Sequence, residues 1–209
     1  YLKKIKEDNP LLINKIETFK ENDLIGNPNL SNYPSIGNIS PTTLRYIKVA
    51  SDLKFIFKEN IGDNICEIGA GYGGQFLILD KVFKLKRYNI FDLKAATLLI
   101  EKYLESFLLN SSYKLNTLNK YDSSKEFDLT ISNYAFSEIE KSMQIKYIEK
   151  VLSKSKRGYL TMNSGKKNSE FRDKHLTLKE LENLLPKFEI IDEKPLIWED
   201  NYIIIWGHH

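Results

Sequence analysis

The stretch Glu67-Ile-Gly69-Ala-Gly71-Tyr-Gly73-Gly74 decides the fold of this chain of 209 residues. It directly follows the strand-like run Asn64-Ile-Cys-Glu-Ile68, and a segment with helical spacing comes after it. Because glycine has no Cβ and accepts positive φ angles, such a turn lets a ligand approach the backbone closely. In open α/β sheets, turns of this kind lie where ligands bind. The stretch therefore predicts a ligand-binding turn between a buried strand and a helix.

From residue 64 onward, strand-like and helical segments alternate, which is typical of a parallel sheet with helices on both faces. Only a short connection separates the last two strands, so we expect them to pair antiparallel. The predicted fold is α/β: a Rossmann-like, seven-stranded, mostly parallel sheet with an antiparallel last strand, helices on both faces and an N-terminal helical cap. Strands are expected at 64–68, 88–91, 113–118, 127–132, 157–162, 187–193 and 201–206, and helices near 73–85, 94–108, 137–153 and 177–185.

Residues 1–59 precede this pattern and are expected to cover the core formed by residues 60–209 without being an independent domain. Up to about residue 25, apolar residues lie near helical spacing, and Pro10 interrupts the helical pattern. Their expected role is packing onto the main body.

The segment 26–41 is dense in turn-forming residues and is expected to be too irregular for a regular element. Long connections inside compact domains are often functional, so this segment is a candidate lid or substrate loop. At its end, Ser40 is a favoured N-cap residue and Pro41 a favoured first helical residue. Together they predict a helix that runs through Leu44, Ile47, Leu53 and Ile56.

Composition excludes several classes of protein. The chain has 31 Lys+Arg against 28 Asp+Glu, a formal charge of +3, and only four arginines, so we expect no nucleic-acid partner. One cysteine, Cys66, excludes an internal disulfide and a multi-thiolate metal site, and its apolar neighbours predict a core residue. No apolar run is long enough for a membrane span, so we expect a soluble protein of the reducing cytoplasm.

The glycines fit two fingerprints, one for dinucleotides (Gly69-x-Gly71-x-x-Gly74) and one for a methyl donor (Glu67-x-Gly69-x-Gly71-x-Gly73). At the strand end, Glu67 would repel a pyrophosphate but accept hydrogen bonds from a cationic or hydroxyl-bearing ligand. Asp92 follows the second strand, where an acidic side chain binds both ribose hydroxyls of either ligand. The short final connection departs from the second half of a dehydrogenase. A methyl donor is therefore favoured, with an NAD-type oxidoreductase as the alternative.

Residues 60–209 resemble class I S-adenosylmethionine-dependent methyltransferases, which have a seven-stranded sheet with an antiparallel last strand. A narrower resemblance is to bacterial sugar O-methyltransferases. The stretches that carry it are Ser40-Pro-Thr-Thr-Leu-Arg-Tyr-Ile-Lys-Val, Glu67-Ile-Gly-Ala-Gly-Tyr-Gly-Gly-Gln75, Tyr88-Asn-Ile-Phe-Asp-Leu93, Ser132-Asn-Tyr-Ala-Phe-Ser-Glu138 and Ile204-Ile-Trp206-Gly207.

The resemblance implies that the cofactor is S-adenosyl-L-methionine and the product S-adenosyl-L-homocysteine. It assigns the glycine turn to the methionine part, Asp92 to the ribose and Leu93 to the adenine. Asp92 is also compatible with a simple helix N-cap. The full set of implied cofactor-binding residues is Glu67, Gly69, Ala70, Gly71, Gly73, Gln75, Asp92, Leu93, Asn116, Thr117, Asn133, Tyr134, Arg45 and Tyr46.

Several members of this set have an equally ordinary structural interpretation. Asn116 and Thr117 follow the third strand and are compatible with a turn, as is Asn133 after the fourth. Arg45 would pair with the carboxylate of the donor if its helix covers the cofactor, and otherwise forms a surface ion pair. Gln75 would contact the cofactor or simply occupy the first helical turn.

Transfer to an oxygen atom adds the need for a group that takes the acceptor's proton, because a sugar hydroxyl is a weak acid. Glu138, after the fourth strand, is one candidate for a catalytic base, although acidic residues also favour a first helical turn. His175, in the loop after the fifth strand, is the other, since a neutral imidazole suits a base near pH 7. Asp173 raises the option of magnesium, but no carboxylate pair makes it specific, and no metal is expected.

The predicted function is thus O-methylation of a small polar acceptor, a sugar hydroxyl or a sugar-derived metabolite. Besides the oxidoreductase, a non-catalytic methyltransferase-like binding domain remains as an alternative. The acceptor is beyond sequence interpretation, because acceptor loops vary on a fixed scaffold.

Overall fold

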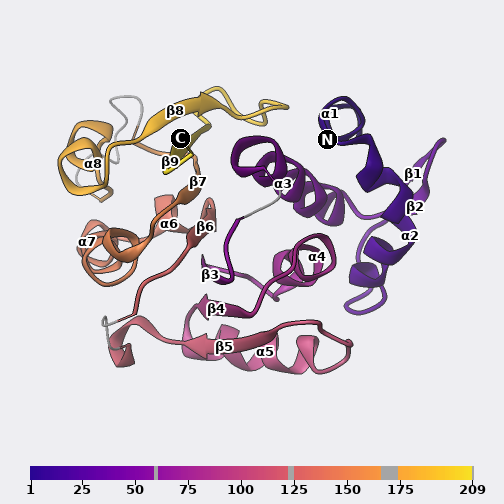
Figure 1. Ribbon diagram of the computed structural model, residues 1–209, viewed down its shortest axis with the longest axis horizontal. Helices are drawn as coiled ribbons and strands as arrows, with labels where there is room; N and C mark the ends of the chain where they lie inside the picture. The colour runs from indigo at the N-terminus through magenta and orange to yellow at the C-terminus, as the bar shows by residue number, and fades with distance from the viewer. Residues whose placement is uncertain (59–60, 122–124, 166–173, 209) are drawn as a thin grey trace.

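A computed structural model describes residues 1–58, 61–121, 125–165 and 174–208. Within these ranges, one seven-stranded sheet forms the centre of the molecule, with helices packed on its two faces (Figure 1). Its strands are β3 (Asn64–Ile68), β4 (Arg87–Phe91), β5 (Ser112–Asn116), β6 (Leu129–Asn133), β7 (Gly158–Met162), β8 (Glu189–Asp192) and β9 (Tyr202–Trp206).

The strand order across the sheet is β5-β4-β3-β6-β7-β9-β8. Strands β3 to β7 pair parallel with one another, whereas β9 pairs antiparallel with both β7 and β8. The expected sheet, with its antiparallel last strand, is confirmed. The order reverses at β3, so the carboxyl ends of β3 and β6 flank the point where such sheets bind ligands.

Alternating side chains of the strands build two cores, one on each face of the sheet. On one face, Ile65, Leu129 and Ile131 pack with the N-terminal segment and with helices α3 to α5. On the other face, Cys66 and Leu160 pack with α6 to α8, which Figure 1 shows to the left of the sheet. Cys66 is fully buried, as the sequence predicts. The helices are α3 (Pro41–Phe57), α4 (Gly74–Val82), α5 (Lys94–Leu104), α6 (Ala135–Glu138), α7 (Lys141–Lys150) and α8 (Leu178–Leu184), with 3-10 turns η3 (Leu118–Lys120) and η4 (Leu152–Lys154).

The N-terminal segment lies against α3 and α4 (Figure 1). Its buried side chains include Ile5, Leu12 and Phe19, which belong to the core of that face. As predicted, Pro10 separates two helical stretches, and Ser40 caps α3 by accepting a hydrogen bond from the Thr43 amide at 3.0 Å. The segment consists of α1 (Leu2–Asp8), η1 (Pro10–Lys15), α2 (Ile16–Phe19) and η2 (Lys20–Asp23).

The expectation of an irregular loop over residues 26–41 is wrong in part. The strands β1 (Ser31–Tyr33) and β2 (Gly37–Ile39) form an antiparallel hairpin inside it. Gly37 has a φ of 72°, a backbone conformation that glycine adopts without strain, and the Asn32 side chain donates to Asn38 across the two strands at 2.8 Å. The turn formers therefore build a tight hairpin instead of an irregular loop.

The single helix expected over 137–153 is divided into α6 and α7. Ile139 lies between them in an extended conformation, and the Gln144 amide donates to the Phe136 carbonyl at 2.8 Å across the break. Ser137 is not an N-cap residue of either helix. Among the described residues, no helix combines the length and the apolar character needed to cross a bilayer.

Candidate functional site

The glycine turn between β3 and α4 depends on left-handed backbone angles. Gly69, Gly71 and Gly73 have φ values of 74°, 61° and 97°. A Cβ added to Gly71 would meet no described atom within 4 Å, so the turn faces open space at this residue. The turn thus exposes backbone where a ligand can approach it.

Gly69 has a second role, since it permits close contact with the neighbouring β6–α6 connection. A Cβ added here would lie 2.1 Å from the Cβ of Ala135, and the Gly69 amide donates to the Phe91 carbonyl at 2.8 Å. The ends of β3, β4 and β6 are therefore packed together directly beside the turn.

Asp92 links the end of β4 to the glycine turn. Its carboxylate accepts one hydrogen bond from the Ala70 amide at 3.0 Å and another from the Leu93 amide at 2.8 Å. The N-cap position of α5 belongs to Leu93, and no side chain caps that helix. The structure therefore places Asp92 across the turn, which differs from the alternative of a simple helix cap.

Glu67, at the end of β3, lies beneath the turn and is only 1% exposed. The Tyr88 hydroxyl donates to its carboxylate at 2.9 Å. Burial disfavours the charged form and raises the pKa of Glu67 to about 8, and the nearby negative charge of Asp92 adds to this effect. The expected carboxylate is thus present, but in a buried and mostly protonated form near neutral pH.

This raised pKa predicts how stability depends on pH. Between the ordinary pKa of 4.5 and the folded value of about 8, the native state keeps a proton that the unfolded chain has lost. The free energy of unfolding should therefore fall as pH rises through this window, by at most about 1.4 kcal/mol per pH unit. Urea unfolding of the wild type and Glu67→Gln across the window measures this, because the variant lacks the titrating group. Equal pH slopes for the two proteins would contradict the prediction.

Arg45 and Tyr46 of α3 lie on the other side of the turn. The Tyr46 carbonyl accepts from the Gln75 side chain at 3.2 Å, and Gln75 in turn accepts from the Asn133 amide at 3.3 Å. The guanidinium of Arg45 lies 5.6 Å from the ring centre of Tyr46 and 5.7 Å from that of Tyr134. These contacts bring the predicted residues of α3, α4 and β6 together around the turn.

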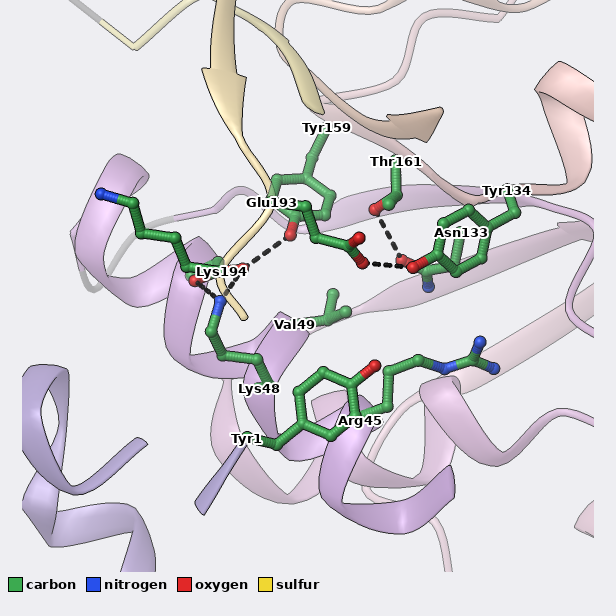
Figure 2. Close-up of a pocket in the computed structure, with 11 residues that line it drawn as sticks. Tyr1, Arg45, Lys48, Val49, Asn133, Tyr134, Tyr159, Thr161, Glu193 and Lys194 are labelled. Atoms are coloured by element: carbon green, nitrogen blue, oxygen red, sulfur yellow. Dashed lines mark hydrogen bonds and ion pairs between the residues drawn. The ribbon is translucent and has the colours of Figure 1, made fainter. Parts of the chain in front are cut away.

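Tyr134 has a φ of 68°, an angle that is uncommon for a bulky residue, and residues in such strained conformations cluster at functional sites. Its phenol donates to the carboxylate of Glu193, which follows β8 (Figure 2). Glu193 is only 7% exposed and also accepts from the Asn201 amide at 2.7 Å. Sequence interpretation missed Glu193, because no motif relates it to a tyrosine 59 residues away.

Three other predicted cofactor residues lie after β4 and at the end of β5, outside the glycine turn itself. The Asn116 amide donates to the carbonyls of Lys114 at 3.2 Å and Ile90 at 3.4 Å, so backbone groups already use it. Thr117 is the N-cap residue of η3 and makes no side-chain cap bond. Leu93 is 77% exposed directly after Asp92 and presents an apolar side chain at the end of β4.

The two candidate bases flank the same segment after α6. Glu138 is exposed and accepts from the Asn163 amide at 2.8 Å. The Nδ1 atom of His175 lies 3.0 Å from the Ile139 carbonyl, so a proton on Nδ1 leaves Nε2 free to accept one. Asp173 lies outside the described residues, and no group of three or more potential metal ligands occurs within them.

We compared the chain with protein-family models, with curated proteins and with solved structures. No protein-family model matches the chain, and no curated protein matches it by sequence. Solved structures do match. A S-adenosylmethionine-dependent methyltransferase from Clostridium acetobutylicum has a TM-score of 0.54 at 12% identity, and 76% of this chain and 87% of that one are covered.

The chain has the Rossmann-like methyltransferase fold. Two further solved structures with this fold are named for different substrates, an amino pentose and a small RNA. CalS10, an amino pentose methyltransferase from Micromonospora echinaspora solved with S-adenosylmethionine, has a TM-score of 0.57 at 9% identity, covering 77% of this chain and 89% of its own. The small RNA methyltransferase HEN1 has a TM-score of 0.53 at 15% identity, covering 80% of this chain and 25% of its own. In this methyltransferase fold, the glycine turn and Asp92 lie at the carboxyl ends of β3 and β4.

Proposed function

We propose that the protein is an S-adenosylmethionine-dependent methyltransferase that acts on a hydroxyl of a small polar acceptor, a sugar or a sugar-derived metabolite. The observation that carries this proposal is that Asp92 is hydrogen-bonded to the glycine turn. Its carboxylate accepts from the Ala70 and Leu93 amides, next to the open space at Gly71. A carboxylate at this position suits a ribose diol, and glycines suit close approach of the rest of the donor.

Different residues of the chain would bind different parts of S-adenosylmethionine. Gly69, Ala70, Gly71 and Gly73 would contact the methionine part, and Glu67 would support the turn from beneath. Asp92 would bind the ribose and Leu93 would cover the adenine. The remaining predicted contacts are Arg45, Tyr46, Gln75, Asn116, Thr117, Asn133 and Tyr134.

When bound, S-adenosylmethionine supplies a methyl group that its sulfonium has already activated. The protein then has to orient the acceptor hydroxyl in line with that methyl group, exclude water and accept a proton.

The amino pentose named for CalS10 supports a sugar-like acceptor, whereas HEN1 is named for RNA. The low arginine content of this chain favours the small acceptor.

Calorimetric titration tests the proposed cofactor directly. S-adenosylhomocysteine should bind to the protein, whereas NADH should not, because the proposal assigns the glycine turn to the methionine part of the donor and not to a pyrophosphate. The reverse result would favour the NAD-type oxidoreductase. Binding of the nucleoside without methyl transfer to any sugar would favour a non-catalytic domain.

Glu138 and His175 remain the proposed bases for the acceptor's proton. We expect that Glu138→Gln or His175→Ala lowers turnover by about 10²–10⁴-fold, the usual contribution of a general base. Binding of S-adenosylhomocysteine should stay unchanged in both variants, since neither residue contacts the glycine turn. Release of S-adenosylhomocysteine from wild type and variants, with and without EDTA, provides the measurement. Near wild-type turnover in both variants would remove both residues from the mechanism.

A further inference from the structure

Two neighbouring hollows lie beside the site, between α3 and the β8–β9 end of the sheet. The first is a small cavity of about 20 Å³ next to Asn133 and Tyr134 (Figure 2). The second is an open groove of about 560 Å³ that runs along α3, β8 and β9. Lys48, Asp52 and Lys194 line both hollows. A groove of this size fits a small-molecule ligand.

A buried ion pair stands where the two hollows meet. The ammonium of Lys48 lies 2.6 Å from Asp52 Oδ1, and the Tyr159 hydroxyl donates to Asp52 Oδ2 at 2.7 Å. The side chains of Lys48 and Asp52 are only 6% and 14% exposed. Removing both charges from water is costly, and an apolar pair of similar volume would often be as stable. Stability alone therefore does not require a charged pair in the wall between the hollows.

Both carboxylates on these walls keep a position for another donor. An ionised carboxylate accepts about four hydrogen bonds. Asp52 accepts two from Lys48 and one from Tyr159, and Glu193 accepts one each from Tyr134, Asn201 and the Ile197 amide. The bonds made by described residues thus leave about one acceptor position on each carboxylate.

The floor of the groove is apolar. Ile191 of β8 and Ile203 and Ile205 of β9 line it, together with Phe55 and Ile56 of α3. Carboxylates combined with an apolar floor match the two kinds of surface on a sugar, its hydroxyl groups and its C–H faces. A nonpolar ligand would leave the remaining acceptor position of each carboxylate unused.

We propose that these two hollows bind the acceptor, a polyhydroxylated molecule whose hydroxyls are recognised by Asp52 and Glu193 and whose carbon skeleton lies along the isoleucine floor. The assignment rests on the proposed function. It also connects with the donor side, because Asn133 lines the small cavity and donates to Gln75, which follows the glycine turn. Asp52 and Glu193 are then residues that bind the acceptor, and Lys48 holds the Asp52 carboxylate in place.

Adjacent residues of β8 provide a matched pair of variants. Ile191 lines the groove, whereas Ile190 is 39% exposed and is not among the residues that line it. Since successive residues of a strand point to opposite faces, Ile191→Trp should fill the groove and Ile190→Trp should leave it open. Asp52→Asn and Glu193→Gln probe the carboxylates, with Glu182→Gln on the exposed side of α8 as their control.

Saturation-transfer NMR with methyl glycosides of glucose, galactose and rhamnose measures acceptor binding in the presence of S-adenosylhomocysteine, with cyclohexylmethanol as a probe that has one hydroxyl. We expect that at least one glycoside binds to the wild type, that cyclohexylmethanol does not, and that Ile191→Trp and the two carboxylate variants weaken binding by about tenfold or more. The Ile190→Trp and Glu182→Gln proteins should bind like the wild type.

The outcomes separate this inference from the proposed function. If S-adenosylhomocysteine binds but no glycoside does, or if Ile191→Trp and Ile190→Trp bind a glycoside equally, the groove is not the acceptor site. If S-adenosylhomocysteine does not bind at all, the proposed function itself fails. Should Asp52→Asn unfold, Ile191→Trp decides the question, because it leaves the buried ion pair intact.

Discussion

Gly69→Ala should destabilise the protein by about 2–5 kcal/mol, because a left-handed backbone costs a residue with a Cβ about 1–2 kcal/mol and overpacking costs about 1–3 kcal/mol more. Both terms follow from the structure, in which Gly69 has a φ of 74° and an added Cβ would lie 2.1 Å from that of Ala135. The clash would push the glycine turn away from the β6–α6 connection. Urea unfolding measures the loss of stability, and titration with S-adenosylhomocysteine should show weakened binding as well.

Gly71→Ala is the matched control for this effect. Its φ of 61° imposes a similar backbone cost, but an added Cβ would meet no described atom within 4 Å. We therefore expect Gly71→Ala to lower stability by only about 1–2 kcal/mol. It should still weaken nucleoside binding, because the methyl group enters the space assigned to the donor. Equal losses of stability in the two variants would show that packing against Ala135 contributes nothing.

Asp92→Ala is expected to weaken binding of S-adenosylhomocysteine by at least about tenfold. Losing hydrogen bonds between a carboxylate and the ribose hydroxyls should cost roughly 1.5–3 kcal/mol. The variant also frees the Ala70 and Leu93 amides that Asp92 now satisfies, so the turn itself should become less well fixed. Calorimetry of wild type and variant gives the two dissociation constants.

A conservative variant tests how much of the loss comes from the charge. Asp92→Asn keeps only one of the two side-chain oxygens that accept from the Ala70 and Leu93 amides and removes the charge, so it should lose affinity and lose less stability than Asp92→Ala. Glu101→Ala, at an exposed position on α5, serves as the control and should bind like the wild type. Wild-type affinity in Asp92→Ala would remove the ribose assignment.

Sequence periodicity predicted the strands and most helices close to their observed bounds, because burial imposes a period of two or 3.6 residues on each element. Local chemistry was equally informative at Ser40 and Pro41, where the α3 cap forms as expected. The β1–β2 hairpin was missed because turn-forming residues are compatible with both a tight turn and an irregular loop. The break at Ile139 was missed because apolar spacing continues across it.

The candidate site also contains residues that the sequence predicts and residues that only the tertiary structure brings together. Residues of the glycine turn and Asp92 lie within single strand-to-helix connections, so their position at the carboxyl edge follows from the α/β pattern. The partnership of Tyr134 with Glu193 joins residues 59 positions apart and depends on where β8 and β9 lie in the sheet. The same holds for Lys48, Asp52 and Tyr159, which bring α3 and β7 together.

By itself, the sequence determined that a strand, a glycine turn and a helix follow one another and that an acidic residue comes after the next strand, because these features are local. Only the tertiary structure decided which carboxylates are buried and what they contact. Glu67 meets Tyr88 because β3 and β4 are neighbours, and the raised pKa of Glu67 follows from its burial there. The order of strands in the sheet sets these environments, and periodicity within a single element does not encode that order.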